Sequence, residues 1–230
     1  MVALILSTFA DSLLAEGDLF NAITEYKRML YEGRGDSSLI LLRVGYAHYL
    51  RRKYDRAAYY FSLAREYVPE AKYLQAASLI LGRDREVALE ILEGDTSGTA
   101  KLLRGLAFIA LGRYARAEAV FDSLGYRPPI RGNREIYIAA SYLLPGSGHL
   151  LIGRYSEGLK TFAANLLSFA GAYYLLKRGL YYDLLMYVPI VLLRFYEGGV
   201  ARVRKHLYDD DMRVVRALAD SLVSEGVGWR

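Results

Sequence analysis

A Pro-Gly-x-Gly break at residues 145–148 constrains the fold of this chain most, because it interrupts an uncharged apolar segment. Successive proline and glycine residues end helices, so one helix must stop at the break and another must start after it. Upstream, the chain is charged, repetitive and rich in Ala, Leu and Tyr. Downstream, two apolar runs at 161–176 and 180–196 are separated only by Lys177-Arg178-Gly179. We therefore predict an all-α protein made of two chemically different parts.

The composition favours a membrane for the second part. A chain of 230 residues can form two modest domains, and its 53% apolar content and mean hydropathy of +0.11 are high for a soluble protein. The apolar excess lies after residue 135. The absence of cysteine excludes disulfides, thiolate nucleophiles and cysteine-ligated zinc, but leaves the compartment open. The net charge of +5 is not gathered with aromatic residues on one helix, so we predict no nucleic-acid partner.

Four segments of the first part share one pattern, a small residue followed four positions later by an aromatic residue or leucine. At this spacing the small and large side chains lie on one face of a helix. Gly45 and Gly105 precede two of the segments and would let a first helix approach its neighbour closely. The four pairs are Ala22 with Tyr26, Ala57 with Phe61, Ala88 with Leu92, and Ala117 with Phe121.

This pattern resembles the tetratricopeptide repeat, a helix-turn-helix unit of about 34 residues with small residues where its helices cross. The segment 41–69 fits the family's order best, and the resemblance covers residues 9–129. It implies a solenoid at 11–129 that binds a protein partner through its concave face. A generic helical bundle is the alternative. The residues assigned to repeat packing are Ala22, Gly45, Ala57, Phe61, Gly105, Ala117 and Phe121.

The first apolar run, 161–176, carries no charge and is framed by a lysine at each end, whose amine can reach lipid headgroups. Ala164, Ser168 and Ala172 recur every four residues, the spacing of small residues that lets two membrane helices pack closely. We predict an apolar helical membrane domain at 136–200 that ends in a transmembrane hairpin. A buried hairpin in a soluble or oligomeric core is the alternative.

The second apolar run contains an acid and a base. The offset between Asp183 and Arg194 places them on nearly the same face of an α-helix, about three turns apart. Charged side chains are unfavourable in lipid, so this face should look away from lipid. We predict a polar intramembrane face formed by these two residues.

The break itself resembles the signature of small bacterial domains with two transmembrane helices. In those domains an apolar run ends in a Pro-Gly-x-Gly turn, and a Gly-Arg-Tyr segment enters the next helix. They usually carry a tyrosine before the later glycine, where this chain has Leu151 or Ile152. The resemblance spans residues 136–200 and implies a membrane domain surrounded by lipid, without known chemistry. The positions that carry it are Pro145, Gly146, Gly148, Gly153 and Arg154.

No motif points to catalysis or to a cofactor. The segment after the break nearly matches a phosphate-binding loop, but an arginine replaces its lysine and a tyrosine replaces its magnesium-binding hydroxyl group. His48, His149 and His206 lie far apart in the sequence, so we predict no metal site.

The ends of the sequence carry two further expectations. Residues 1–10 are apolar with small residues near Ala10, so they are either the remnant of a secretory signal or the start of the first helix. Residues 206–226 are predicted to form a separate amphipathic helix that starts at Asp209-Asp210-Asp211, where acidic residues favour the helix dipole.

Two arguments about membrane orientation disagree. If only the hairpin spans, Lys177 and Arg178 lie on one side and the other basic residues gather on the side of the repeats, which places the repeats in the cytoplasm. The signal-like opening instead favours export. We expect the repeats on the extracytoplasmic, periplasmic side of the cell membrane, with the cytoplasmic face as the alternative.

We therefore predict a non-enzymatic, membrane-anchored scaffold that mediates protein–protein interaction in the bacterial cell envelope. It would contact lipid and an unknown protein partner and could form a homo-oligomer. Two alternatives stay open: a component of a membrane transport or protein-insertion system, and a soluble oligomeric helical-repeat protein.

Overall fold

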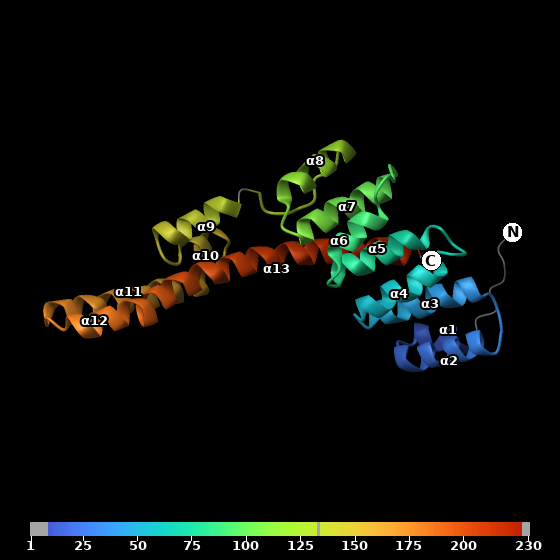
Figure 1. The fold of residues 1–230 in the computed structure, drawn as a ribbon, viewed down its shortest axis with the longest axis horizontal. Coiled ribbons are helices and arrows are strands. Elements are labelled where there is room, and N and C mark those ends of the chain that lie inside the picture. Colours follow the sequence, from blue (N-terminus) through green and yellow to red (C-terminus); the bar gives the residue numbers. More distant parts are fainter. Residues whose placement is uncertain (1–8, 133, 227–230) are drawn as a thin grey trace. The chain divides into compact units, whose positions relative to one another are not determined.

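The computed structural model of the protein describes residues 9–132 and 134–226. Within these residues every regular element is a helix, as the predicted all-α class requires (Figure 1). The helices form two compact units. Unit 1 contains residues 9–128 together with 212–226, and unit 2 contains the described residues between 129 and 211. The last helix contributes to both units, and we call its part in unit 1 the C-terminal segment.

Unit 1 is a succession of short helices in which each contacts the next along the chain. Aspartate or serine side chains cap three of them, because Asp18, Asp36 and Ser97 accept hydrogen bonds from free amides of the first helical turn. The helices are α1 (Phe9–Ala15), α2 (Leu19–Tyr31), α3 (Ser37–Leu50), α4 (Tyr54–Ala64), α5 (Ala71–Leu81), α6 (Arg85–Ile91), α7 (Gly98–Ala110) and α8 (Tyr114–Leu124).

One tight turn recurs between these helices. Gly17 and Gly112 adopt positive φ angles of 83° and 74°, and the next helix starts two residues later in each case. The following amide reaches back five residues to a carbonyl group, as in a Schellman motif. Arg52 holds the same position between α3 and α4 with a φ of 56°, a conformation that glycine adopts more easily.

Glycines and alanines bring the helices of unit 1 close together. Phe61 of α4 packs on Gly45 of α3, and Phe121 of α8 packs on Gly105 of α7. The aromatic rings fill the space that a side chain on either glycine would need. Buried alanines on α2, α4 and α8 continue the same packing, so the core is built from small residues facing large ones.

In its described residues, unit 2 has three short helices, two long ones and a π-helical turn. The core near its break contains Ile152, Val203 and Leu207. In this unit α10 contacts both α9 and α11, while α11 contacts α12 and the π turn η1. Its elements are α9 (Arg134–Leu143), α10 (Ser147–Leu151), α11 (Tyr155–Lys177), α12 (Tyr181–Tyr187), η1 (Val188–Leu192) and the first part of α13 (Leu193–Gly226).

The structure differs from the expectation for the C-terminal end of the chain. The aspartates at 209–211, expected to start a helix, lie inside α13, which begins at Leu193 and runs without a break. At the other end, Phe9 and Ala10 belong to α1, and Ala10 is buried. The rest of the expected signal remnant, residues 1–8, lies outside the described residues.

Candidate functional site

The C-terminal segment forms part of the core of unit 1. Val215, Ala219 and Val223 recur every four residues along α13 and are fully buried. Beside them, Tyr49 of α3 donates a hydrogen bond to Oδ1 of Asp220 at 2.6 Å. Burial, with this hydrogen bond, raises the pKa of Tyr49 far above its ordinary value, so its phenol remains a donor at any physiological pH. This surface of α3 is therefore already occupied by a helix of the same chain.

A cavity of about 660 Å³ remains beside the C-terminal segment. Tyrosine rings, arginine guanidinium groups, one carboxylate and serine hydroxyl groups line it. Tyrosine and arginine are the residue types that dominate protein interfaces, because they combine apolar contact with directed hydrogen bonds. The lining residues are Tyr46, Tyr49, Leu50, Arg52, Tyr54, Arg216, Ala217, Asp220, Ser221 and Ser224.

The residues assigned to repeat packing are all buried in unit 1. The structure brings Gly45 together with Phe61 and Gly105 together with Phe121. Their assignment to a known repeat family stays a prediction. The other positions in the set, Ala22, Ala57 and Ala117, are fully buried.

Local sequence patterns do not predict a group of three buried polar side chains in unit 1. Nη1 of Arg43 lies 2.9 Å from Oδ1 of Asp11, and the hydroxyl group of Tyr26 donates to the same carboxylate at 2.5 Å. Burial, with the Asp11 contact, raises the pKa of Tyr26 above its ordinary range. The group joins α1, α2 and α3, so it acts in packing.

The Pro-Gly-x-Gly break lets three helices of unit 2 meet closely. A Cβ atom on Gly148 would lie 1.9 Å from Oγ of Ser141, and one on Gly146 would lie 2.4 Å from the carbonyl oxygen of Gly158. Glycine at these two positions therefore allows α10 to pack against α9 and the loop at Gly146 to approach α11. Of the remaining motif positions, Pro145 precedes α10, Gly153 has a φ of 83° before α11, and Arg154 directly precedes the first residue of α11.

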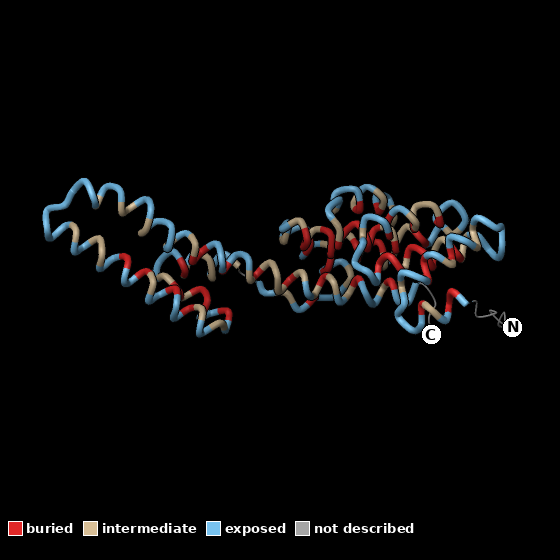
Figure 2. Tube along the Cα trace, turned by 90° about the horizontal axis from the view of Figure 1, so that it is seen from below, coloured by how far each residue is buried: buried red, intermediate tan, exposed pale blue. Residues whose placement is uncertain are grey.

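The burial pattern of α11 is the reverse of that in a soluble protein. Its buried residues include Thr161, Asn165 and Ser168, and all of them are polar or glycine. Large apolar side chains such as Leu167, 73% exposed, face away from the unit. In α12 no residue is buried. Figure 2 shows the part of unit 2 around α12, at the left, almost entirely in the exposed and intermediate colours.

One described helical stretch, Tyr181–Gly226, is long and apolar enough to cross a membrane by length and composition. Only 11% of its most apolar window is buried, whereas the core helix of a soluble protein would be mostly buried. Asp183 and Arg194 both lie on this stretch and are exposed, and no ion pair joins these two described residues. The π turn η1 lies between them and changes their angular offset, because a π turn takes more residues than an α turn. Their shared polar face stays a prediction.

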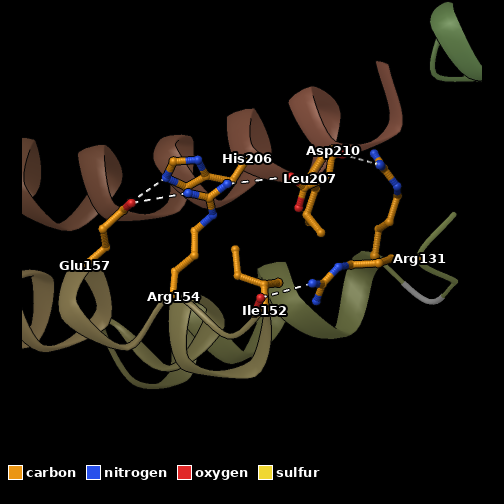
Figure 3. Close-up of polar contacts among 8 residues, drawn as sticks. Arg131, Ile152, Arg154, Glu157, His206, Leu207 and Asp210 are labelled. Carbon is orange, nitrogen blue, oxygen red and sulfur yellow. Dashed lines mark hydrogen bonds and ion pairs between the residues drawn. The ribbon is translucent and has the colours of Figure 1, made fainter. Parts of the chain in front are cut away.

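Three polar side chains from three helices meet at the start of α11. They are His149 of α10, Glu157 of α11 and His206 of α13, and one nitrogen or oxygen atom of each lies within 4.8 Å of the other two. Oε2 of Glu157 is 2.5 Å from Nε2 of His206 (Figure 3). His149 is fully buried, and neither of its ring nitrogens has a hydrogen-bond partner among the described residues. We call these residues the His-Glu-His cluster.

The charges around the cluster set its protonation. Burial lowers the pKa of His149, and the nearby cations Arg202 and Arg154 act in the same direction. His149 is therefore neutral at physiological pH. One carboxylate oxygen of Glu157 faces Nε2 of His206, and the other faces Arg154.

Two arginines near the start of α9 connect the helices that carry the cluster. In unit 2, Arg131 donates to the carbonyl oxygen of Ile152 at 3.1 Å (Figure 3). Arg134 donates to the carbonyl oxygen of Leu207 at 2.7 Å. Arg134 also pairs with Asp211. The contacts of Arg134 join α9 to α13, and the contact of Arg131 joins the segment before α9 to the residue directly after α10. Local sequence patterns do not predict the cluster, because its histidines lie far apart along the chain.

The comparisons with known proteins find no relative. The chain matches no protein-family model, no curated protein and no solved structure.

Proposed function

We propose that this protein is a non-enzymatic, membrane-anchored scaffold of the cell envelope, with unit 1 as a tetratricopeptide-type solenoid and unit 2 as a transmembrane hairpin. The observation that carries the proposal is the reversed burial of α11. Thr161, Asn165 and Ser168 face inward, whereas leucine, phenylalanine and tyrosine side chains face outward. A helix with this arrangement is stable where its surroundings are apolar, because its polar groups then gain more from contact with protein than from contact with lipid.

The lengths of the helices agree with this role. The 23 residues of α11 extend about 34 Å at 1.5 Å per residue, enough to cross a hydrocarbon layer of about 30 Å. Contacts of Gly171 with Tyr187 and of Gly199 with Thr161 support an antiparallel pairing of α11 with the helix that follows. Small residues at such contacts let membrane helices pack closely. The basic pair at 177–178, at the turn between α11 and α12, would then lie in the headgroups.

Unit 1 supplies the binding surface of the proposed scaffold. Because the C-terminal segment fills part of the surface near α3, a partner would bind in the cavity beside it. Its tyrosines and arginines suit a peptide segment that carries aromatic and acidic side chains. The partner is expected on the extracytoplasmic side if the orientation expected from the sequence holds.

Single cysteines test the anchor cleanly, because the chain has no cysteine of its own. The variants are Tyr67→Cys in unit 1, Leu167→Cys in the middle of α11 and Arg178→Cys at the turn, all at exposed positions. In intact cells, a membrane-impermeant maleimide should label the first but not the third. The cysteine at 167 should react only after detergent denaturation.

The outcomes of this experiment separate the alternatives. Labelling at 178 but not at 67 would keep the anchor and reverse its orientation. Equal labelling of all three in a soluble fraction of lysed cells, with no protein in the carbonate-washed membrane, would refute the anchor and favour a soluble oligomer.

Capture from detergent-solubilised membranes tests the scaffold. The full-length protein should retain a partner that a Tyr54→Ala, Arg52→Glu variant loses, because both side chains line the cavity. Tyr31→Ala is the matched control, since Tyr31 lies on α2 outside the cavity and is exposed. Equal capture by all three proteins would contradict a scaffold that uses this cavity.

A second candidate function, in membrane transport or protein insertion, has one observation in its favour. The π turn η1 carries Pro189 inside an apolar helix, and π turns occur frequently at functional sites. If Asp183 and Arg194 serve such a path, Asp183→Asn should leave the fold intact and remove the cellular phenotype. Lost stability that Arg194→Gln partly restores would instead favour a structural pair.

A further inference from the structure

We propose that the His-Glu-His cluster is a binding site for a divalent first-row transition-metal ion, with Zn²⁺ preferred over Mg²⁺ and Ca²⁺. His149, Glu157 and His206 would each supply one ligand atom. The site lies wholly within unit 2 and is independent of the proposed scaffold role.

The donor types select the metal. Two imidazole nitrogens and one carboxylate oxygen suit zinc and its neighbours, whereas Mg²⁺ and Ca²⁺ prefer oxygen ligands throughout. Three protein ligands leave at least one coordination position for water or an added ligand. That position has access to solvent, because the side chains of Glu157 and His206 are 37% and 19% exposed.

The geometry needs only small side-chain movements. Two ligands of a tetrahedral zinc ion lie about 3.3 Å apart, given bonds of about 2.0 Å. The cluster atoms lie within 4.8 Å of one another, and the closest two, on Glu157 and His206, are 2.5 Å apart. Rotation of these two side chains would exchange their shared proton for the ion. The other oxygen of Glu157 faces Arg154 at 3.4 Å, which leaves Oε2 for the metal.

His149 gives the independent observation. A buried polar group without a hydrogen-bond partner destabilises a folded protein, and such groups need an explanation. His149 is fully buried, has no partner for either ring nitrogen among the described residues, and lies with its ring 5.8 Å from that of His206. Coordination of a metal ion would give one ring nitrogen of His149 a partner.

His48 shows what a buried histidine without such neighbours looks like. It is also buried without a hydrogen-bond partner in the described part of the chain, but its ring stacks on Tyr60 at 5.3 Å. In the described residues it belongs to no group of metal-ligating side chains. His48 is therefore a matched control for His149.

Cations around the cluster limit its affinity. Arg154 and Arg202 contribute positive charge near His149, and Asp210 offsets part of it, since it lies 3.6 Å from Arg154. Metal binding would nevertheless join α10, α11 and α13 through one ion. It should therefore stabilise unit 2 as any ligand of the folded state does.

Titration of the full-length protein in detergent with Co²⁺, a spectroscopic substitute for Zn²⁺, tests the site. The wild type should bind one equivalent with a visible absorption band that Zn²⁺ removes and Mg²⁺ does not. Glu157→Gln and His206→Gln should each weaken binding by more than about tenfold, and so should His149→Gln. His48→Gln should bind like the wild type. Zn²⁺ should raise the melting temperature of the wild type but not of the Glu157 and His206 variants.

Three results would overturn the proposal. The first is a wild type that binds no Co²⁺. The second is binding that persists unchanged in Glu157→Gln and His206→Gln, both of which alter partly exposed side chains and should fold. The third is an equal loss of binding in His48→Gln, which would mark adventitious binding to histidine.

Discussion

Phe61 lies so close to Gly45 that a Cβ atom on the glycine would stand 2.7 Å from Cε1 of the ring. The same relationship joins Phe121 to Gly105, where the distance would be 2.5 Å. The aromatic ring of the second helix thus rests on the backbone of the first in two separate helix pairs. In packing this close, the size of the residue beneath the ring determines whether the two helices can stay at this distance.

Adding one methyl group beneath either ring should destabilise unit 1. We expect Gly45→Ala or Gly105→Ala to lower the free energy of unfolding by about 1–3 kcal/mol, because overpacking forces the ring to move. Denaturant melts of the full-length protein in detergent measure this. Gly98→Ala is the control, since a Cβ atom at the start of α7 meets nothing within 4 Å. A loss in Gly98→Ala as large as in the other two would contradict the packing argument.

A second glycine substitution should disrupt unit 2. Gly148→Ala places a methyl group 1.9 Å from Oγ of Ser141 and 2.5 Å from the carbonyl oxygen of Tyr137, so α9 and α10 must separate. We expect faster proteolysis near the break and a lower melting temperature. Gly198→Ala, where a Cβ atom meets open space on α13, should behave like the wild type. If Gly148→Ala resists proteolysis as well as Gly198→Ala does, the break tolerates a side chain at this position.

Replacing Arg52 by glycine should stabilise the protein. Arg52 has a φ of 56°, and this left-handed conformation is unfavourable by roughly 1–2 kcal/mol for a residue with a Cβ atom. We expect Arg52→Gly to raise the free energy of unfolding by about 1 kcal/mol. The reciprocal change, Gly112→Ala at a φ of 74°, should lower it by a similar amount. The prediction fails if both changes shift the midpoint of the unfolding curve in the same direction.

Acid should destabilise unit 1 through His48. Burial, with the nearby cations Lys27, Arg56 and Arg51, lowers the pKa of His48 from 6.5 to about 4. Above pH 6.5 both the folded and unfolded chains hold a neutral imidazole, so the contribution to stability is complete. Between pH 6.5 and about 4 only the unfolded chain takes up the proton, so stability falls by up to about 3 kcal/mol.

Unfolding curves across this pH range, for the wild type and for His48→Gln, separate this effect from other acid-sensitive groups. The slope of stability against pH should be smaller in the variant. Identical slopes would show that His48 takes up its proton equally in both states.

Local spacing in the sequence was sufficient for several features of the fold. Small and large residues four positions apart predicted helix faces with apolar packing, and the apolar content after residue 135 predicted apolar helices. Both depend only on neighbours along one helix. The roles of Gly146 and Gly148 in letting helices approach could be suspected from the break, but the atoms they face, on Gly158 and Ser141, could not.

Other features depend on contacts between distant parts of the chain. His149 and His206 meet only because the turn at Gly153 reverses the chain and the α11–α12 connection returns it, and no local pattern records that meeting. The place of the C-terminal segment in unit 1 is similar, since its stripe of Val215, Ala219 and Val223 could face any apolar surface.

The shared helix α13 has a consequence for the order of synthesis. A ribosome makes α1 to α8 first, then all of unit 2, and only then the residues that complete the core of unit 1. While unit 2 is being made, the surface around Tyr49 lacks its covering helix, and its apolar side chains are available to chaperones or to other nascent chains. On the proposed membrane role, insertion of α11 and α12 would precede the final folding of unit 1. Maturation of the two units would then follow the opposite order from their first appearance in the chain.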